Sequence, residues 1–116
     1  MFSLADAIIN EHMTGIEQML RSGVDVNELD EYGFRPLIEA AIVDNIEIAK
    51  LLLARGALPN LQDVTGGTAL HWATENNNIA LCKLLLEHKA DPNAYNFAGQ
   101  PVLVMPVLRE QSALRK

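Results

Sequence analysis

The sequence is poor in aromatic residues: they make up 5% of its 116 residues, although 49% of the residues are hydrophobic. The core must therefore consist mainly of leucine, isoleucine, valine and alanine. Straight-chain residues and alanine lose little freedom in a helix, so this composition favours helices over strands. A chain of this length forms one domain, and we expect a single all-α domain over residues 1–116.

Basic residues and cysteines are also few. Nine Lys and Arg stand against fifteen Asp and Glu, a net charge of −6. Such a surface repels nucleic acid and anionic membranes, so we expect neither as a partner and favour a protein with a basic surface. Cys82 is the single cysteine. It excludes an internal disulfide and paired-thiolate metal sites, and it fits a reducing, cytoplasmic or otherwise intracellular compartment.

Long apolar runs are missing too. The run Ala40–Val43 is far shorter than the roughly 18 to 20 residues that a membrane span requires. The N-terminal stretch MFSLADAIIN has no basic segment before its apolar residues and carries Asp6 within them, which is unlike a secretory signal. The sequence therefore predicts a soluble chain, which we expect to be a monomer.

The sequence does contain a repeat with a period of 33 residues. Ranges 30–62 and 63–95 are identical at 13 of their 33 positions. The residues that recur at this step are Gly33, Gly66 and Gly99; Leu4, Leu37, Leu70 and Leu103; and Asn27, Asn60 and Asn93. Repeats of this length are typical of stacked units, each of which buries its apolar face against its neighbours.

Each unit has a readable plan, which range 30–62 illustrates. Asp30–Gly33 predicts a turn, and Pro36 suits the first position of a short helix that runs to about Asp44. A second helix is expected over Ile46–Arg55, and Gly56 suits a left-handed helix cap. The apolar stripe of this second helix is predicted to contain Ile46, Ala49, Leu52 and Leu53.

The stretch Asp63–Ala73 reads DVTGGTALHWA and matches the motif D-x-x-G-x-T-P-L-H-x-A, followed by Ile79–Leu86 for a second helix and Ala90–Asn93 for A-D-x-N. In these residues the chain resembles the ankyrin repeat, although Arg35 and Ile38 replace the motif's Thr and His in the preceding unit. The resemblance implies an all-α solenoid of stacked helix-turn-helix units linked by β-hairpin-like loops. It also implies non-catalytic binding of a partner protein on the concave face and the hairpin tips.

The two ends depart from this plan. The expected units are 1–29, an N-terminal cap, then 30–62, 63–95 and an incomplete or degenerate unit 96–116. In the first unit Gly15 stands where later units have Ile48 and Leu81. At the other end the chain stops before the equivalents of Leu51–Leu53. Two interpretations remain: a fragment of a longer protein, which we favour, or a terminal cap whose helix is Pro106–Lys116.

Three candidates for chemistry have simpler structural explanations. His71 could be a base or metal ligand, but the resemblance implies that it ties adjacent hairpin loops together. Cys82 takes the place of Ala49 and is expected to be a buried, inert thiol. Gly66–Gly67 lacks the rest of a phosphate-binding motif and predicts a turn. We expect no catalytic residue, no metal and no cofactor, and hence no enzyme.

Trp72 is either buried against neighbouring helices or a partly exposed binding anchor. The resemblance places it with the variable tip and concave positions, to which we assign binding, rimmed by Glu31, Glu39 and Glu75. The predicted protein-binding residues are Glu31, Tyr32, Phe34, Ile42, Val43, Val64, Thr65, Trp72, Glu75, Asn76 and Phe97.

Other interpretations stay open. The chain could be the targeting module of a larger enzyme or of a secreted effector that acts in a host cytosol, or it could be a plain spacer. Asn60 and Asn93 are also placed like asparagines that are hydroxylated in ankyrin repeats. The simpler interpretation is that their amides close the hairpin loops.

Overall fold

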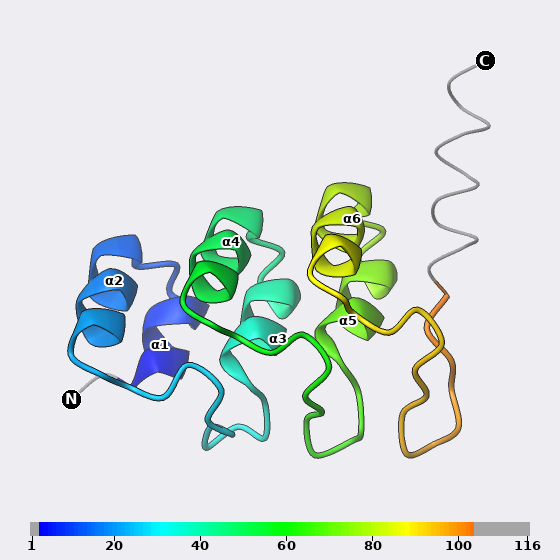
Figure 1. The fold of residues 1–116 in the computed structure, drawn as a ribbon. Coiled ribbons are helices and arrows are strands. Elements are labelled where there is room, and N and C mark those ends of the chain that lie inside the picture. The colour runs from blue at the N-terminus through cyan, green and yellow to red at the C-terminus, as the bar shows by residue number, and fades with distance from the viewer. Residues whose placement is uncertain (1–2, 104–116) are drawn as a thin grey trace.

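The computed structural model describes residues 3–103, and helices come in pairs from Leu4 to Glu87 (Figure 1). The predicted all-α solenoid is confirmed. In chain order the helices of this range are α1 (Leu4–Ile9), α2 (Met13–Arg21), α3 (Pro36–Ile42), α4 (Ile46–Ala54), α5 (Ala69–Glu75) and α6 (Ile79–Glu87).

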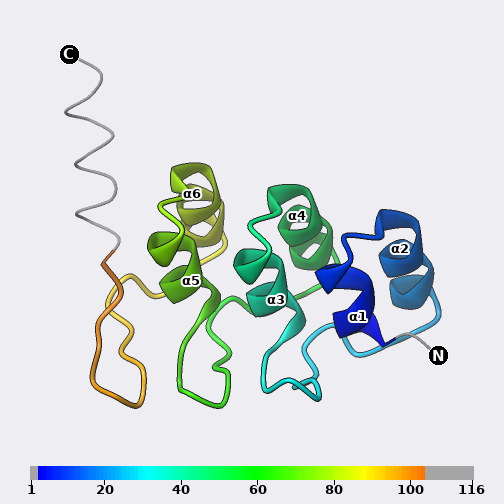
Figure 2. The same ribbon diagram turned by 180° about the vertical axis from the view of Figure 1, so that it is seen from behind.

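The pairs stack side by side, so that helices 33 residues apart become neighbours. Within the pairs α1 contacts α2, α3 contacts α4 and α5 contacts α6. Between pairs, α3 contacts both α1 and α5, while α4 contacts α6. Seen from the two opposite sides, α1, α3 and α5 form one row and the loops between pairs extend beyond one end of the helices (Figures 1 and 2).

The helices begin where the sequence supplies a suitable cap. Ser3 and Asp6 form a capping box at α1, with Ser3 Oγ accepting from the Asp6 N–H at 3.1 Å. Asn45 and Asn78 cap α4 and α6 by accepting from backbone N–H groups three residues later. The equivalent residue before α2 is His12, which makes no side-chain cap hydrogen bond.

The core lies between the two rows of helices, and one predicted stripe needs correction. In α4 the fully buried residues include Ile48, whereas Ile46 is only half-buried. Asn45 caps the helix through the N–H of Ile48, so Ile46 falls in the first turn at the edge of the stack. Leu81 is the buried counterpart of Ile48 in α6.

Gly15 occupies the same place in α2, and the structure shows why a larger residue is absent. A Cβ on Gly15 would lie 2.7 Å from Nδ1 of His12. The imidazole therefore covers the position that Ile48 and Leu81 fill in the later pairs. At the N-terminal end of the stack an exposed ring thus stands where the later pairs have a buried aliphatic side chain.

The helix ends repeat as well. Gly56 follows α4 with a φ of +90°, which confirms the predicted left-handed cap. Lys89 takes the equivalent place after α6 with a φ of +73°, a conformation that is unfavourable for a residue with a side chain. The third pair therefore carries strain that the second pair avoids.

None of these helices is long and apolar enough to cross a membrane, a statement that covers residues 3–103. The expected helix Pro106–Lys116, and with it most of the expected unit 96–116, lies outside the described residues.

Candidate functional site: the hairpin tips

Each loop between helix pairs is built around one acceptor side chain. We number each hairpin by the unit that it opens, so the hairpin of residues 30–35 is the second and that of residues 63–68 is the third. In the third hairpin Asp63 Oδ1 accepts from the N–H groups of Thr65 (2.8 Å) and Gly67 (3.0 Å). In the second, Asp30 Oδ1 accepts from the N–H groups of Tyr32 (2.9 Å) and Phe34 (3.0 Å). The period of 33 residues thus places the same turn in successive units.

Asn96 makes the equivalent contacts in the next hairpin. Its Oδ1 accepts from the N–H groups of Ala98 (3.0 Å) and Gln100 (2.9 Å). The same loop is closed by an isolated antiparallel bridge between Tyr95 and Pro101. The expected hairpin-like loops are therefore present in residues 30–35, 63–68 and 96–101.

Backbone hydrogen bonds join one tip to the next. The N–H of Val64 donates to the carbonyl of Gly33 at 3.1 Å, and the N–H of Phe97 donates to the carbonyl of Thr65 at 2.9 Å. A Cβ on Gly66 would lie 2.6 Å from the Phe97 nitrogen, and one on Gly33 would lie 2.8 Å from Val64 Cγ2. The two glycines are required for contact between hairpins, as well as for their positive φ. Sequence reasoning found only the turn.

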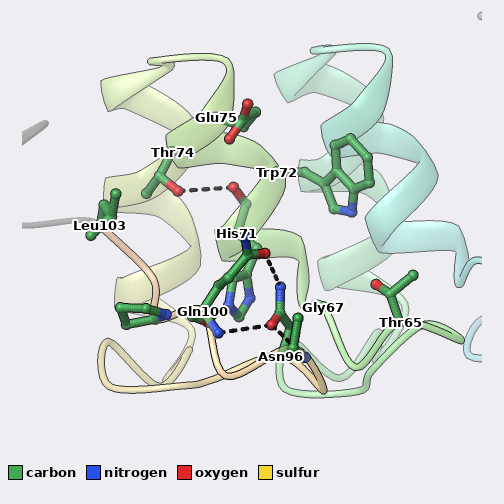
Figure 3. Close-up of a pocket in the computed structure, with 11 residues that line it drawn as sticks. Thr65, Gly67, His71, Trp72, Thr74, Glu75, Asn96, Gln100 and Leu103 are labelled. Atoms are coloured by element: carbon green, nitrogen blue, oxygen red, sulfur yellow. Dashed lines mark hydrogen bonds between the residues drawn. The ribbon is translucent and has the colours of Figure 1, made fainter.

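His71 ties two loops together, as the resemblance implied. Its Nδ1 lies 3.1 Å from the N–H nitrogen of Thr68 and 3.0 Å from Thr68 Oγ1. Its Nε2 lies 3.3 Å from the carbonyl oxygen of Gln100 in the next hairpin (Figure 3). Both ring nitrogens are therefore engaged in the architecture.

Trp72 points from α5 towards the preceding pair (Figure 3). Its ring meets that of Phe34 edge to face, with centroids 5.9 Å apart and an interplanar angle of 84°. Its Nε1 donates to Asp63 Oδ2 at 3.3 Å. The side chain is half-buried, so it connects the second hairpin to the third and still presents part of its surface.

Three of the exposed apolar side chains lie at the tips, while others, such as Ile9 and Leu58, lie elsewhere in residues 3–103. Relative exposure is 51% for Tyr32, 59% for Val64 and 72% for Phe97. Glu31 and Thr65 beside them are also exposed. We call these five residues, one or two from each of three hairpins, the tip row.

The other predicted binding residues are distributed differently. Phe34, Ile42 and Val43 are half-buried and pack against the core, so they are less exposed than the sequence suggested. Glu75 is exposed. Asn76 is exposed too, but its Nδ2 donates at 2.8 Å to the carbonyl of Ala41 at the end of α3, which also accepts from the N–H of Asp44.

Glu39 was expected at the rim of the binding surface, and this was wrong. Its side chain is 3% exposed, because the neighbouring helices and the second hairpin cover it. Burial, followed by contact with the Asp30 carboxyl, raises the pKa of Glu39 to about 8. Sequence position alone gave no sign of this, since the equivalent residues Asp6 and Trp72 are both half-buried.

A hydrogen bond between the second hairpin and α1 changes the pKa values of two side chains. The Tyr32 hydroxyl donates to Asp6 Oδ1 at 2.8 Å. This bond lowers the pKa of Asp6 and raises that of Tyr32. The hydrogen bond thereby holds the tip tyrosine against α1.

Trp72 and His71 also line an open groove beside the third pair, whose other wall is the hairpin around Gln100 (Figure 3). Within residues 3–103 no group of three or more His, Cys, Asp or Glu side chains is placed to hold a metal ion. Burial raises the pKa of the Cys82 thiol to about 11, so it is protonated and a poor nucleophile.

The Asn60 amide was expected to close a hairpin loop, but it instead joins its unit to the loop that follows α6 in the next unit. Its Nδ2 donates to the carbonyl of Lys89 at 3.0 Å, and its Oδ1 accepts from the N–H of Asp91 at 2.7 Å. Asn27 makes the matching contact one unit earlier, with its Oδ1 accepting from the N–H of Leu58 at 2.9 Å.

A stack of helix pairs with interlocked hairpins defines the class of helical repeat solenoids. More particularly, the chain belongs to the ankyrin-repeat family: the family model described as ankyrin repeats (3 copies) matches residues 4–96. Ankyrin repeats are protein–protein interaction modules.

Similar proteins share this fold in different settings. The chain is 38% identical over 60 residues to cyclin-dependent kinase 4 inhibitor B of Bos taurus, covering 52% of this chain and 45% of that protein. It is 42% identical over 55 residues to putative ankyrin repeat protein L371 of Acanthamoeba polyphaga mimivirus, covering 47% of this chain and 7% of that protein.

A solved structure, that of the Legionella effector AnkH, is similar to nearly the whole chain. The two share 50% sequence identity and a TM-score of 0.83, over 99% of this chain and 25% of the effector's. The chain therefore spans less than half the length of these relatives.

Proposed function

We propose that this chain is a non-catalytic interaction module that binds a partner protein with its tip row and the adjacent face of α3 and α5. One observation carries the proposal: Tyr32, Val64 and Phe97 are exposed side by side on hairpins that backbone hydrogen bonds lock together. An ordered apolar row of this kind loses little entropy on binding and is expensive to leave in water.

Charge points to the nature of the partner. Glu31 lies within the tip row and Glu75 is exposed on α5. With a net charge of −6 the chain favours a partner that offers basic side chains around an apolar centre. The same charge disfavours nucleic acid and anionic membranes.

The side chains that could take part in catalysis are engaged in structural contacts or buried, which favours a module without catalysis. His71 uses both ring nitrogens in loop contacts, and the Cys82 thiol is buried and protonated. We propose a single domain over 1–116 with units 1–29, 30–62, 63–95 and 96–116, monomeric and resident in a reducing, intracellular compartment.

A second candidate is a targeting module within a larger enzyme or effector. It is favoured by the similarity to the Legionella effector AnkH, because the matched region makes up only 25% of the effector's chain. In that case the tip row would select the place of action while another domain acts, and the effector would work in a host cytosol.

Site-specific photo-cross-linking tests the proposed surface. A photoreactive phenylalanine analogue at Phe97 and, in a second protein, at Val64 should cross-link one and the same partner from an extract of the native source. The matched control places the analogue at Lys83, which is exposed on α6 in the other row of helices. Equal cross-linking of that partner from Lys83 would overturn the proposed surface.

A further inference from the structure

The strongest unexplained feature is a pair of buried carboxyl oxygens in the second unit. Asp30 Oδ2 and Glu39 Oε2 are the buried side-chain oxygens of residues 3–103 that have no hydrogen-bond donor. The Asp30 carboxyl is close enough to Glu39 that, beyond burial, it raises the pKa of Glu39 through a hydrogen bond and through its charge. Two carboxylates cannot both be ionised in such a place without a cation, because each would be unsolvated and would repel the other.

The third unit shows what this arrangement requires. Asp63 is the repeat equivalent of Asp30, and its Oδ2 accepts a hydrogen bond from Trp72 Nε1 at 3.3 Å. Trp72 is in turn the repeat equivalent of Glu39. The hairpin aspartate therefore receives a hydrogen bond from this helix position, and Glu39 can supply one only if its carboxyl is protonated.

We propose that Glu39 carries a proton in the folded protein and donates it in a hydrogen bond to Asp30 Oδ2, which fixes the second hairpin as Trp72 fixes the third. The hydrogen bond is an O–H···O⁻ contact in a buried site, a strong type. Its consequence is a hairpin in which this hydrogen bond depends on pH, next to one in which the donor, the Trp72 N–H, does not titrate.

The surrounding charges support protonation. The charges that act on Glu39 are those of Asp30 and Glu31, and both are negative. Of the helices packed against α3, α1 carries Asp6, which accepts from the Tyr32 hydroxyl, and α5 carries the exposed Glu75.

The cations of this region are directed elsewhere. Arg35 donates to the backbone carbonyls of Gln62 and Asn27. On α4, Lys50 lies 3.6 Å from Glu47. On α5 the His71 ring contacts Thr68 and Gln100.

The direction of the pH effect follows from the two states. Unfolded Glu39 loses its proton near its ordinary pKa of 4.5, whereas in the folded chain its pKa is about 8. Between these values the folded state holds a proton that the unfolded state has released, so rising pH destabilises the fold. The stabilisation is complete below pH 4.5 and is lost as the pH rises to about 8. This pH dependence is expected of the chain alone, without any bound partner.

Melting curves of the 116-residue chain at pH 5 and pH 8.5 test this proposal. In Glu39→Gln the amide donates to Asp30 Oδ2 at every pH, so its Tm relative to the unsubstituted chain should rise between the two conditions by about 5 °C or more. The matched control Glu75→Gln makes the same change on an exposed side chain, and its Tm difference should not depend on pH. A Glu39→Gln difference that is equal at both pH values would overturn the proposal.

A direct titration removes any dependence on the folding of the variant. The side-chain carboxyl ¹³C resonance of Glu39 in the unsubstituted chain should shift between pH 7 and pH 9. In Asp30→Asn the amide can donate to Glu39 instead, so the midpoint should fall towards the ordinary value. A Glu39 resonance that titrates near pH 4.5 in the unsubstituted chain would contradict the shared proton.

Discussion

The second and third hairpins have the same backbone and differ in the side chain that meets the central aspartate. In the third, Trp72 supplies a permanent N–H donor to Asp63; in the second, Glu39 faces Asp30. The architecture of the repeat thus specifies a hydrogen bond at this place but not the chemical group that makes it. At this position one unit has a donor that does not titrate, and its neighbour has one that depends on a proton.

The largest effect that separates the two units is expected from the aspartates. Asp63→Ala removes the acceptor of two backbone N–H groups, the Thr65 hydroxyl and Trp72 Nε1 at a site that is 4% exposed. Leaving buried donors unpaired should lower the free energy of unfolding by about 3 kcal/mol. Asp30→Ala removes the acceptor of two backbone N–H groups and of the proposed hydrogen bond from Glu39, one contact fewer than at Asp63, so the loss should be smaller, about 2 kcal/mol. Urea unfolding at pH 7 measures both, and equal losses would contradict the distinction.

The next-largest difference in stability between the units is expected from substitutions of the glycines at the tips. Gly66→Ala places a methyl group against the Phe97 backbone, which cannot rotate away, and should cost about 2 to 3 kcal/mol. Gly33→Ala meets the side chain of Val64, which can shift, and should cost about 1 to 2 kcal/mol. Gly99→Ala is the control, because it has the same positive φ and no atom within 4 Å. A loss for Gly66→Ala no greater than that for Gly99→Ala would show that contact between hairpins is unimportant.

Trp72→Phe isolates the permanent donor. The ring contact with Phe34 is largely kept, while the hydrogen bond to Asp63 Oδ2 is lost. We expect a loss of about 1 to 2 kcal/mol that is the same at pH 5 and pH 8.5. Chemical denaturation at both values provides the measurement. A loss that changes with pH would contradict a hydrogen bond from Trp72 that is independent of pH.

The smallest effect should be a gain. Lys89 has a φ of +73° where the preceding pair has Gly56. Lys89→Gly relieves this strain and should raise the free energy of unfolding by about 0.5 to 1 kcal/mol. The reciprocal change Gly56→Lys should lower it by a similar amount. Differential melting of the two variants checks the pair, and a Lys89→Gly protein that melts earlier would contradict the assignment of strain.

The sequence predicted the fold well because its period and its local signals agree. Pro36, Asn45 and Asn78 stand at helix starts, and Gly56 stands at a helix end, where the repeat requires them. The loop role of His71 followed from its place in the motif.

The burial of individual positions was harder to predict. Glu39 is a charged residue, and such residues usually lie at the surface. Its burial beside Asp30 is visible only once the helix pairs are stacked. Likewise, Phe34 and Val43 are apolar at variable positions because they fill space between units, a role that depends on their neighbours in three dimensions. Local patterns cannot show contacts that arise only when one unit is laid against the next.

The affinity of the partner captured by cross-linking tests the central claim most directly. Tyr32→Ala with Phe97→Ala removes two of the three apolar side chains of the tip row, and calorimetric titration should show a loss of affinity of at least about 10-fold. Lys83→Ala with Glu87→Ala changes two exposed residues of α6 and should leave the affinity within about 2-fold. If the tip variant remains folded, as judged by its melting temperature, and binds as tightly as the unsubstituted chain, the tip row is not the binding surface.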